Sequence, residues 1–411
     1  MSSLHAFLTA HSLIATSIVK TVVLLFLVLT ALAYLTWFER KVVGHIQSRW
    51  GPYRVGPHGL LQPLADGLKF IMKEDPFPIG ADKFVYFLAP LLSMAVALTA
   101  LGIIPFGPQE ITIFGRTSSL AIVDLNLGLL FLFAISSLGV YGVALAGWAS
   151  NSKYPLLGGL RSSAQMISYE LSLTLSVVGV LLMAGSFSLS DIIQHQQGWT
   201  WHFLPRWNLF AGPLPQILGF FCYFVAAIAE TNRAPFDLAE AEQELVGGFH
   251  TEYSSMKFAM FFMAEYANMV TVSCLATILF FGGWLSPAPT AGHWAWTLYI
   301  PAVVFVICGL MLIWDGITYT TNIGKVELVI LGFVLTGMGA LTALPFAINF
   351  VQGPFWFLTK VLAFLFIYVW VRGTLPRFRY DQLMAIGWKL LLPVSLANVV
   401  LTSLALVVTG R

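Results

Sequence analysis

The stretch Ile18–Phe38, IVKTVVLLFLVLTALAYLTWF, decides the fold class of this chain. A helix of about 20 mostly apolar residues is long enough to cross a hydrocarbon core of about 30 Å. The stretch is too long for the apolar core of a signal peptide, and no small-residue cleavage site follows it. We therefore predict that it is a retained membrane span.

Similar apolar stretches recur along the whole chain. Hydrophobic residues make up 58% of the sequence and charged residues 10%, whereas soluble domains carry about 25% charged residues. These values predict an all-α polytopic membrane protein, a single membrane domain over residues 1–411 with about ten transmembrane helices. The expected spans are residues 18–38, 84–105, 121–148, 163–184, 214–230, 257–283, 298–316, 327–348, 354–371 and 385–408.

Basic residues are unevenly distributed between the loops on the two sides. Of the 21 Lys and Arg residues, sixteen lie in alternate loops, and cytoplasmic loops of membrane proteins carry the excess of such residues. We therefore expect these loops in the cytoplasm, and both termini on the outer side of a bacterial inner membrane or an equivalent energy-transducing membrane. The basic loops are residues 39–83, 149–162, 231–257, 317–326 and 372–389.

The first cytoplasmic loop, residues 39–83, contains an amphipathic pattern. From Leu60 to Met72 apolar residues recur at helical spacing, and polar residues fill the other face. This pattern is typical of a helix in the membrane interface, and Pro63 suits its first turn, where no amide donor is needed. A short helix that is covered by another part of a protein would show the same pattern and is the alternative interpretation.

The same loop begins with the charged stretch Trp37–Lys41 and continues into Gly51–Pro57, where two Gly-Pro pairs impose a fixed, irregular path. A fixed basic loop suits docking against a soluble partner, although a positive-inside anchor explains the same residues. The candidates for partner docking come from this loop and from the C-terminal basic loop: Arg49, Arg54, Arg377 and Arg379.

Ionisable residues inside or next to the spans need an explanation, because a charge within the bilayer costs several kcal/mol. Glu170 lies inside one span, and seven carboxylates lie between Glu230 and Glu265, in and around the acidic cytoplasmic loop 231–257. Crowded, partly buried carboxylates cannot all be ionised, so some should hold protons near neutral pH. A solvated acidic loop and ion pairs between helices are the alternatives. The candidate proton relay consists of Glu170, Glu230, Arg233, Glu240, Glu242, Glu244 and Glu265.

Sequence signatures of cofactor binding are missing from the chain. Cys222, Cys274 and Cys308 stand singly in apolar segments, without a second Cys or a His at metal-ligand spacing. There is no G-x-x-x-x-G-K-[ST] loop and no dinucleotide-binding fingerprint. We therefore expect no metal, flavin or iron–sulfur centre on this chain, and any such centre on partner subunits.

Seven stretches in order along the chain carry a family resemblance. They are Glu39–Lys41 with the Gly-Pro loop, Gln62–Asp66, Gly147–Tyr154, Arg161–Glu170, Ala229–Glu252, Phe262–Tyr266 and the stretch from Arg372 to Met384. They resemble the signature stretches of the H-type membrane subunit of respiratory complex I, the NADH dehydrogenase subunit 1 family.

The resemblance implies an eight-span core beneath the peripheral arm of a proton-translocating NADH–quinone oxidoreductase. Such a subunit forms the lipid-side entrance and part of the wall of the quinone chamber, with quinone as substrate. It begins a charged path toward antiporter-like proton-pumping subunits. The other implied partners are hydrophilic quinone-site and iron–sulfur subunits, small membrane subunits and the lipid bilayer, with no nucleic acid. The implied chamber and entrance residues are Glu39, Arg40, Asp66, Phe262 and Arg372.

The chain departs from the family pattern between about residues 284 and 353, where two extra spans form an inserted pair. An even insertion keeps the downstream orientation, so we expect a transmembrane hairpin at the periphery, against lipid or an accessory subunit. Neither the sequence pattern nor the family resemblance indicates a role for Asp315, Lys325 or Glu327.

Two other functions are alternatives. The equivalent subunit of a membrane-bound hydrogenase or formate–hydrogen lyase belongs to the same superfamily, and one chain does not show which electron donor its partners use. A secondary transporter would differ in class. The sequence contains no inverted repeat, however, and its charges gather on one face rather than at the midplane of the membrane.

Overall fold

The computed structural model describes residues 2–108, 111–113, 116–118, 121–200, 204–237, 248–289, 292–319 and 322–410. Within these residues, nine helical segments are long and apolar enough to cross a membrane. Two short antiparallel pairs, β1–β2 and β3–β4, account for the strands of the described residues. The prediction of an all-α polytopic membrane protein is confirmed.

The membrane-length segments are α1 (Ser2–Ile46), α3 (Lys83–Ile103), α4 (Gly128–Ala149), α5 (Lys153–Ala184), α9 (Ser255–Phe280), α10 (Ile300–Thr318), α11 (Asn322–Thr342), α12 (Pro345–Thr374) and a C-terminal run of α13 (Tyr380–Ala385), the π-helical turn η4 (Ile386–Leu391) and α14 (Leu392–Thr409). The connections contain η1 (Pro57–Gly59), α2 (Gln62–Met72), β1 (Ile111–Ile113), β2 (Arg116–Ser118), α6 (Leu189–His195), β3 (Trp199–Thr200), β4 (Leu204–Pro205), η2 (Gly248–His250) and η3 (Gly292–Tyr299).

The remaining expected span is α7 (Ile217–Glu230), which is apolar but has only 14 residues. At about 1.5 Å per residue, a helix of this length does not cross a hydrocarbon core. It can begin inside the protein because Gln216, just before it, is fully buried and hydrogen-bonded. The side-chain amide of Gln216 donates to Thr402 of α14 over 3.0 Å and accepts from Asn398 over 2.8 Å.

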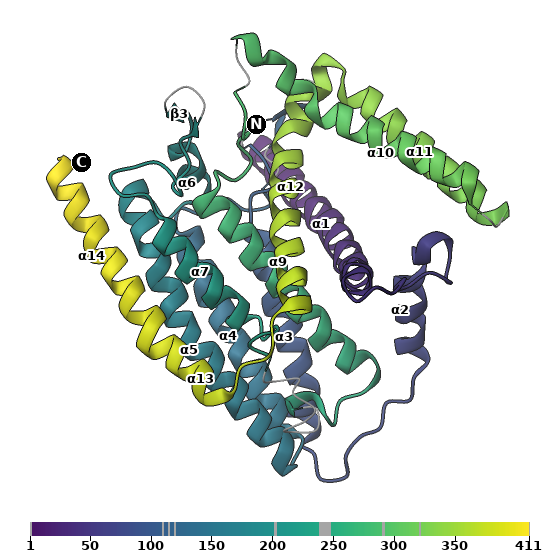
Figure 1. Ribbon diagram of the computed structural model, residues 1–411, viewed down its shortest axis with the longest axis vertical. Helices are drawn as coiled ribbons and strands as arrows, with labels where there is room; N and C mark the ends of the chain where they lie inside the picture. Colours follow the sequence, from purple (N-terminus) through teal and green to yellow (C-terminus); the bar gives the residue numbers. More distant parts are fainter. Residues whose placement is uncertain are drawn as a thin grey trace.

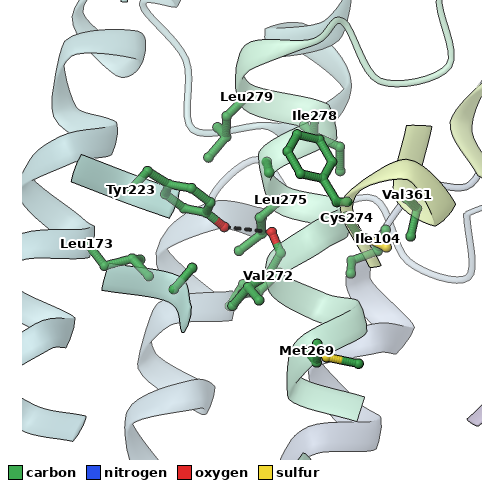
Figure 2. Packing of buried hydrophobic residues seen from close by; sticks show 14 of the residues in the cluster. Ile104, Leu173, Tyr223, Met269, Val272, Cys274, Leu275, Ile278, Leu279 and Val361 are labelled. Carbon is green, nitrogen blue, oxygen red and sulfur yellow. Dashed lines mark hydrogen bonds between the residues drawn. The ribbon is translucent and has the colours of Figure 1, made fainter. Parts of the chain in front are cut away.

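The core surrounds α9, the most deeply buried of the membrane-length segments. It packs against α3, α7 and α12, and most side chains from Met269 to Phe280 are buried. Figure 2 shows Tyr223 of α7 reaching toward α9, where its hydroxyl donates a 2.8 Å hydrogen bond to the carbonyl oxygen of Val272. The phenol is thereby satisfied in an apolar core. Helices α3, α4 and α5 extend the bundle, and α14 covers α5 (Figure 1).

Helix α2 lies apart from the core, between α1 and the start of α9 (Figure 1). Each of its residues is at least partly exposed, including Leu64, Leu68 and Ile71 of the apolar face. Pro63 stands in its first turn, as predicted. Because the described part of the chain leaves this apolar face uncovered, the structure favours a position in the membrane interface over a helix packed under this protein.

Helices α10 and α11 pack on each other as an antiparallel hairpin. A Cβ atom at Gly309 would lie 2.7 Å from the carbonyl oxygen of Gly332, so glycine lets the two backbones approach closely. In Figure 1 the hairpin projects away from the bundle beyond α12. Helix α11 ends at Thr342, before the expected boundary, because Pro345 opens α12 and a proline does not continue a preceding helix.

Candidate functional site

Glu39 is the centre of a buried charged site that joins four parts of the chain. Its side chain, near the end of α1, is 5% exposed. Tyr266 of α9 donates a 2.6 Å hydrogen bond to its Oε2 atom. Arg372 of α12 forms an ion pair and a hydrogen bond with its Oε1 atom. A buried carboxylate is thus held by a phenol and a guanidinium group from two other helices.

Arg233 connects this site to a second carboxylate. Its Nη1 atom lies 3.7 Å from Oε1 of Glu39, and its Nη2 atom lies 3.9 Å from Oε2 of Glu265. The guanidinium group also lies 4.2 Å from the ring centroid of Tyr266 and 5.6 Å from that of Phe262. Arginine stays charged in proteins, so Arg233 is a fixed cation shared by two carboxylates.

The turn after α7 aims Arg233 into this site. Asn232 has a φ of 49°, a left-handed conformation that asparagine tolerates better than most residues. Gln165 of α5 holds the turn, because its side-chain amide donates to the carbonyl oxygens of Ala229 over 2.7 Å and of Phe236 over 2.8 Å. Gln165 is fully buried. It belongs to a stretch that carries the resemblance, yet it had no predicted role.

Glu265 and Glu230 line a common cavity between α7, α9 and η2. Its volume is about 30 Å³, enough for one or two water molecules. The Oε2 atom of Glu230 is buried and has no hydrogen-bond partner among the described residues. A buried carboxyl oxygen needs a partner, and the polar cavity is able to supply one as water. Asn232 and Asn268 also line this space.

Glu170 extends the row of carboxylates. It is half-buried on α5, which packs against α7, and it interacts electrostatically with Glu230. The structure therefore brings four of the candidate relay residues together with Glu39: Glu170, Glu230, Arg233 and Glu265. The other three, Glu240, Glu242 and Glu244, lie outside the described residues.

Arg40 forms a separate, more exposed pair with Asp66 of α2. Its Nη1 atom lies 2.7 Å from Oδ2 of Asp66, and Gln62 donates a 3.1 Å hydrogen bond to the other carboxylate oxygen. Successive residues of a helix point about 100° apart, so α1 directs Glu39 into the protein and Arg40 outward. The five residues predicted for the quinone chamber therefore divide into an inner group around Glu39 and an outer group made by Arg40 and Asp66.

The four docking arginines are exposed. Arg49 and Arg54 stand in the Gly-Pro loop beside Trp50, which is 78% exposed. Arg377 contacts a distant part of this chain, because its Nη2 atom lies 3.2 Å from Oδ2 of the buried Asp237. This ion pair ties the C-terminal loop to the turn after α7.

A second cluster joins the loop before α3 to the start of α9. Nζ of Lys257 lies 2.8 Å from Oδ2 of Asp75 and 4.6 Å from the ring centroid of Tyr86. Tyr86 stacks on Tyr253 with 4.2 Å between ring centroids. Burial is the main reason that the pKa of Tyr253 is raised, and the neighbouring Tyr86 raises it further. The phenol of Tyr253 therefore stays neutral. The cluster fixes one end of the segment that carries α2.

Tyr266 and His58 are contacts of the site that sequence reasoning missed. Tyr266 lies in the stretch Phe262–Tyr266, and a phenol beside a glutamate within a span was the available signal. His58 lies 2.7 Å from Asp315. Its position directly after the second Gly-Pro pair gave no indication of a partner on an inserted hairpin.

Comparison with known proteins places the chain in a family. Residues 19–403 match the profile of the NADH dehydrogenase family. An H-type subunit of the NADH-quinone oxidoreductase of Solibacter usitatus is 51% identical over 391 residues, which cover 95% of this chain and 96% of the relative. An H-type subunit from Koribacter versatilis is 52% identical over 398 residues, 94% of this chain and 96% of the relative. An H-type subunit from Geobacter metallireducens is 43% identical over 397 residues, 94% of each chain. This chain belongs to the family of H-type subunits of NADH-quinone oxidoreductase.

Proposed function

We propose that this chain, a membrane subunit of an NADH–quinone oxidoreductase, forms the quinone entrance and part of the chamber wall, and begins the charged path to proton-pumping subunits. The observation that carries the proposal is the contact of Glu39 with Arg233 and Arg372. It joins residues expected at the chamber to residues expected in the relay. Quinone is the substrate, and flavin and iron–sulfur centres belong to hydrophilic partner subunits.

Arg233 couples the two carboxylates on either side of it. Unit charges about 4 Å apart interact by about 4 kcal/mol at an effective dielectric constant of 20, and Arg233 lies 3.7 Å from Glu39 and 3.9 Å from Glu265. A proton taken up by one carboxylate weakens its hold on Arg233 and strengthens the pairing with the other. Charge at the chamber is thereby transmitted to α9.

The path continues from Glu265 through the shared cavity to Glu230 and then to Glu170. Water in the cavity would connect the two carboxyl groups that line it. Collective titration is expected for carboxylates this close, with apparent pKa values that belong to the group. The three glutamates of the acidic loop, which lie outside the described residues, are further members of the relay in this proposal.

The outer pair of Arg40 and Asp66 provides the entrance. A cation beside the apolar, uncovered face of α2 suits a polar headgroup that arrives from lipid with a hydrophobic tail. The exposed loop of Arg49, Trp50 and Arg54 provides the docking surface for the peripheral arm, since exposed arginine and tryptophan are enriched at protein interfaces. The names of the relatives support quinone as substrate over the hydrogenase alternative.

Replacing Arg40 with alanine in the assembled complex tests the entrance. We expect a rise of about three- to fivefold in the KM for a long-tailed quinone, because Asp66 loses a partly exposed ion-pair partner worth up to about 1 kcal/mol. NADH oxidation by an artificial acceptor at the flavin should keep the parental rate, since it does not use the membrane chamber.

Arg206→Ala is the matched control, because Arg206 is an exposed arginine in the expected outer loop 185–213. It should leave all kinetic constants unchanged. Parental quinone kinetics in Arg40→Ala would show that this pair does not form the entrance.

A further inference from the structure

The turn Pro57–Gly59 is held from two sides. From α1, the indole Nε1 of Trp37 donates a 3.3 Å hydrogen bond to the carbonyl oxygen of His58. From the hairpin, Oδ2 of Asp315 lies 2.7 Å from Nε2 of His58. The hydroxyl of Tyr319 also accepts a 3.3 Å hydrogen bond from the backbone N–H of His58. The hairpin therefore contacts the Gly-Pro loop, which the sequence did not predict.

Aromatic rings extend this contact. The ring centroid of Tyr319 lies 5.0 Å from that of His58 and 6.4 Å from that of Tyr53. On its other side, Tyr53 meets Lys41 of α1, whose Nζ atom lies 5.6 Å from the ring centroid. A hydrogen bond with the Tyr319 side chain raises the pKa of Tyr53. The contact thus combines a histidine–carboxylate contact, hydrogen bonds and ring packing.

The loop around His58 is stiff, so its position is transmitted to α2. His58 has a φ of 51°, and a Cβ atom at Gly59 would lie 2.6 Å from the carbonyl oxygen of Pro52. The turn therefore packs tightly on the first Gly-Pro pair, at Pro52. Helix α2 begins directly after it, at Gln62, and presents Asp66 to Arg40 of α1. The position of His58 therefore sets where α2 begins and where Asp66 lies relative to Arg40.

We propose that Asp315 is a positioning residue for the quinone entrance: it holds His58 and thereby fixes the Arg40–Asp66 pair at that entrance. The proposal rests on the proposed function of that pair. It makes the inserted hairpin an outer support of the entrance rather than a purely lipid-facing addition. Asp315 and His58 are partly exposed, at 44% and 33% of their side chains, so the pair positions the loop and does not bury a charge.

Asp315→Asn and Glu327→Gln are compared in the assembled complex. Glu327 is an exposed carboxylate on the same hairpin. For Asp315→Asn we expect the KM for a long-tailed quinone to rise about three- to fivefold, the size of effect that weakening one partly exposed side-chain hydrogen bond supports. The kcat and the KM for a short-tailed quinone should stay parental, because a short tail does not occupy the entrance while the headgroup reacts. Glu327→Gln should match the parent.

A second measurement does not use quinone. In a chain whose native cysteines are replaced, cysteines introduced by His58→Cys and Asp315→Cys should be joined by a short thiol-specific cross-linker. The pair His58→Cys and Glu327→Cys should react less. Absence of the first cross-link overturns the proposal, as do equal changes in KM for both quinones. A parental KM in Asp315→Asn despite cross-linking also overturns it, and if Arg40→Ala is parental as well, the assignment of the entrance itself is wrong.

Discussion

At the scale of single residues, charge balance organises the site. Glu39 and Glu265 are balanced by Arg233 and Arg372, and removing one partner of such a buried set leaves an uncompensated charge. Glu230 differs from these residues. Its buried Oε2 atom has no hydrogen-bond partner among the residues that the structure describes, and the residue lines a water-sized cavity. It is the member of the row best placed to exchange a proton with water.

Glutamine at the relay positions should uncouple pumping from electron transfer. Glu170→Gln, Glu230→Gln and Glu242→Gln keep the size and hydrogen bonding of the side chain while removing its titratable proton. We expect proton transfer through each altered position to slow by about 10²-fold or more, and the protons moved per electron to fall. The measurement is proton uptake by reconstituted vesicles during quinone reduction, with the amount of assembled complex determined in parallel.

Glu252→Gln is the matched control, since Glu252 belongs to the same acidic stretch and is outside the proposed relay. Normal assembly with a parental ratio of protons to electrons at a relay position would show that the residue is not part of the path. Loss of assembly would favour the alternative in which these residues hold the loop to a partner subunit.

At the scale of elements, hydropathy predicted the membrane helices better than their ends. Each expected span overlaps a helix, because apolar length is a property of the sequence alone. The early start of α5 at Lys153 and of α12 at Pro345 was missed because a helix makes its backbone hydrogen bonds internally and can therefore extend past the hydrocarbon region, where hydropathy gives no signal. The length of α7 depends on hydrogen bonds from Gln216 to α14, which local sequence does not contain.

Deleting the α10–α11 hairpin and joining the flanking spans should leave an assembled and active complex. The hairpin packs mainly on itself, and most of its described side chains are at least partly exposed. We expect the kcat for a short-tailed quinone to stay within about twofold of the parent, because fold-determining contacts of the bundle are kept and surface changes are small. Turnover of purified, assembled complex measures this.

A matched variant, with the hairpin kept and only residues 320–321 between its two helices replaced by a Gly-Ser pair, shows the effect of a sequence change in this region without loss of the helices. Complete loss of turnover in the deletion, despite assembly, would show that the hairpin belongs to the mechanism.

At the scale of the whole molecule, the distribution of charge predicts the orientation of the chain. A cysteine at position 408 should react with a membrane-impermeant maleimide added outside intact cells. A cysteine at position 325 should react only in inverted vesicles. The difference should be at least about tenfold in labelling, because a charged reagent does not cross the hydrocarbon core. The reverse labelling pattern would place both termini in the cytoplasm.

A chain that retains only Cys222 and Cys274 serves as the labelling blank, since both side chains are buried. It should remain unlabelled from either side. The comparison then reports only the introduced residues.

The composition of the site was more predictable than its geometry. Charged residues in and beside spans drew attention to Arg233 and Glu265, because a membrane protein keeps such residues only for a reason, and the family resemblance added Glu39 and Arg372. Their pairing was not predictable, since Glu39 and Arg372 are 333 positions apart and pattern within one helix does not report contacts between helices. The sequence separated chamber residues from relay residues. It did not predict that Arg233 contacts a member of each group, Glu39 and Glu265.

The distance between Glu39 and Arg372 along the chain has a consequence for biosynthesis. At about 5–20 residues per second, a ribosome takes roughly a quarter of a minute to a minute to travel between two positions that are 333 apart. Between the synthesis of Glu265 and that of Arg372, the carboxylates Glu39 and Glu265 share one cation, Arg233, and the site carries one carboxylate too many. A chain that stops early keeps this excess charge in or beside the bilayer. Arg372 is thus the last of the site's four charged residues to be synthesised, and the site becomes charge-balanced only once Arg372 is in place.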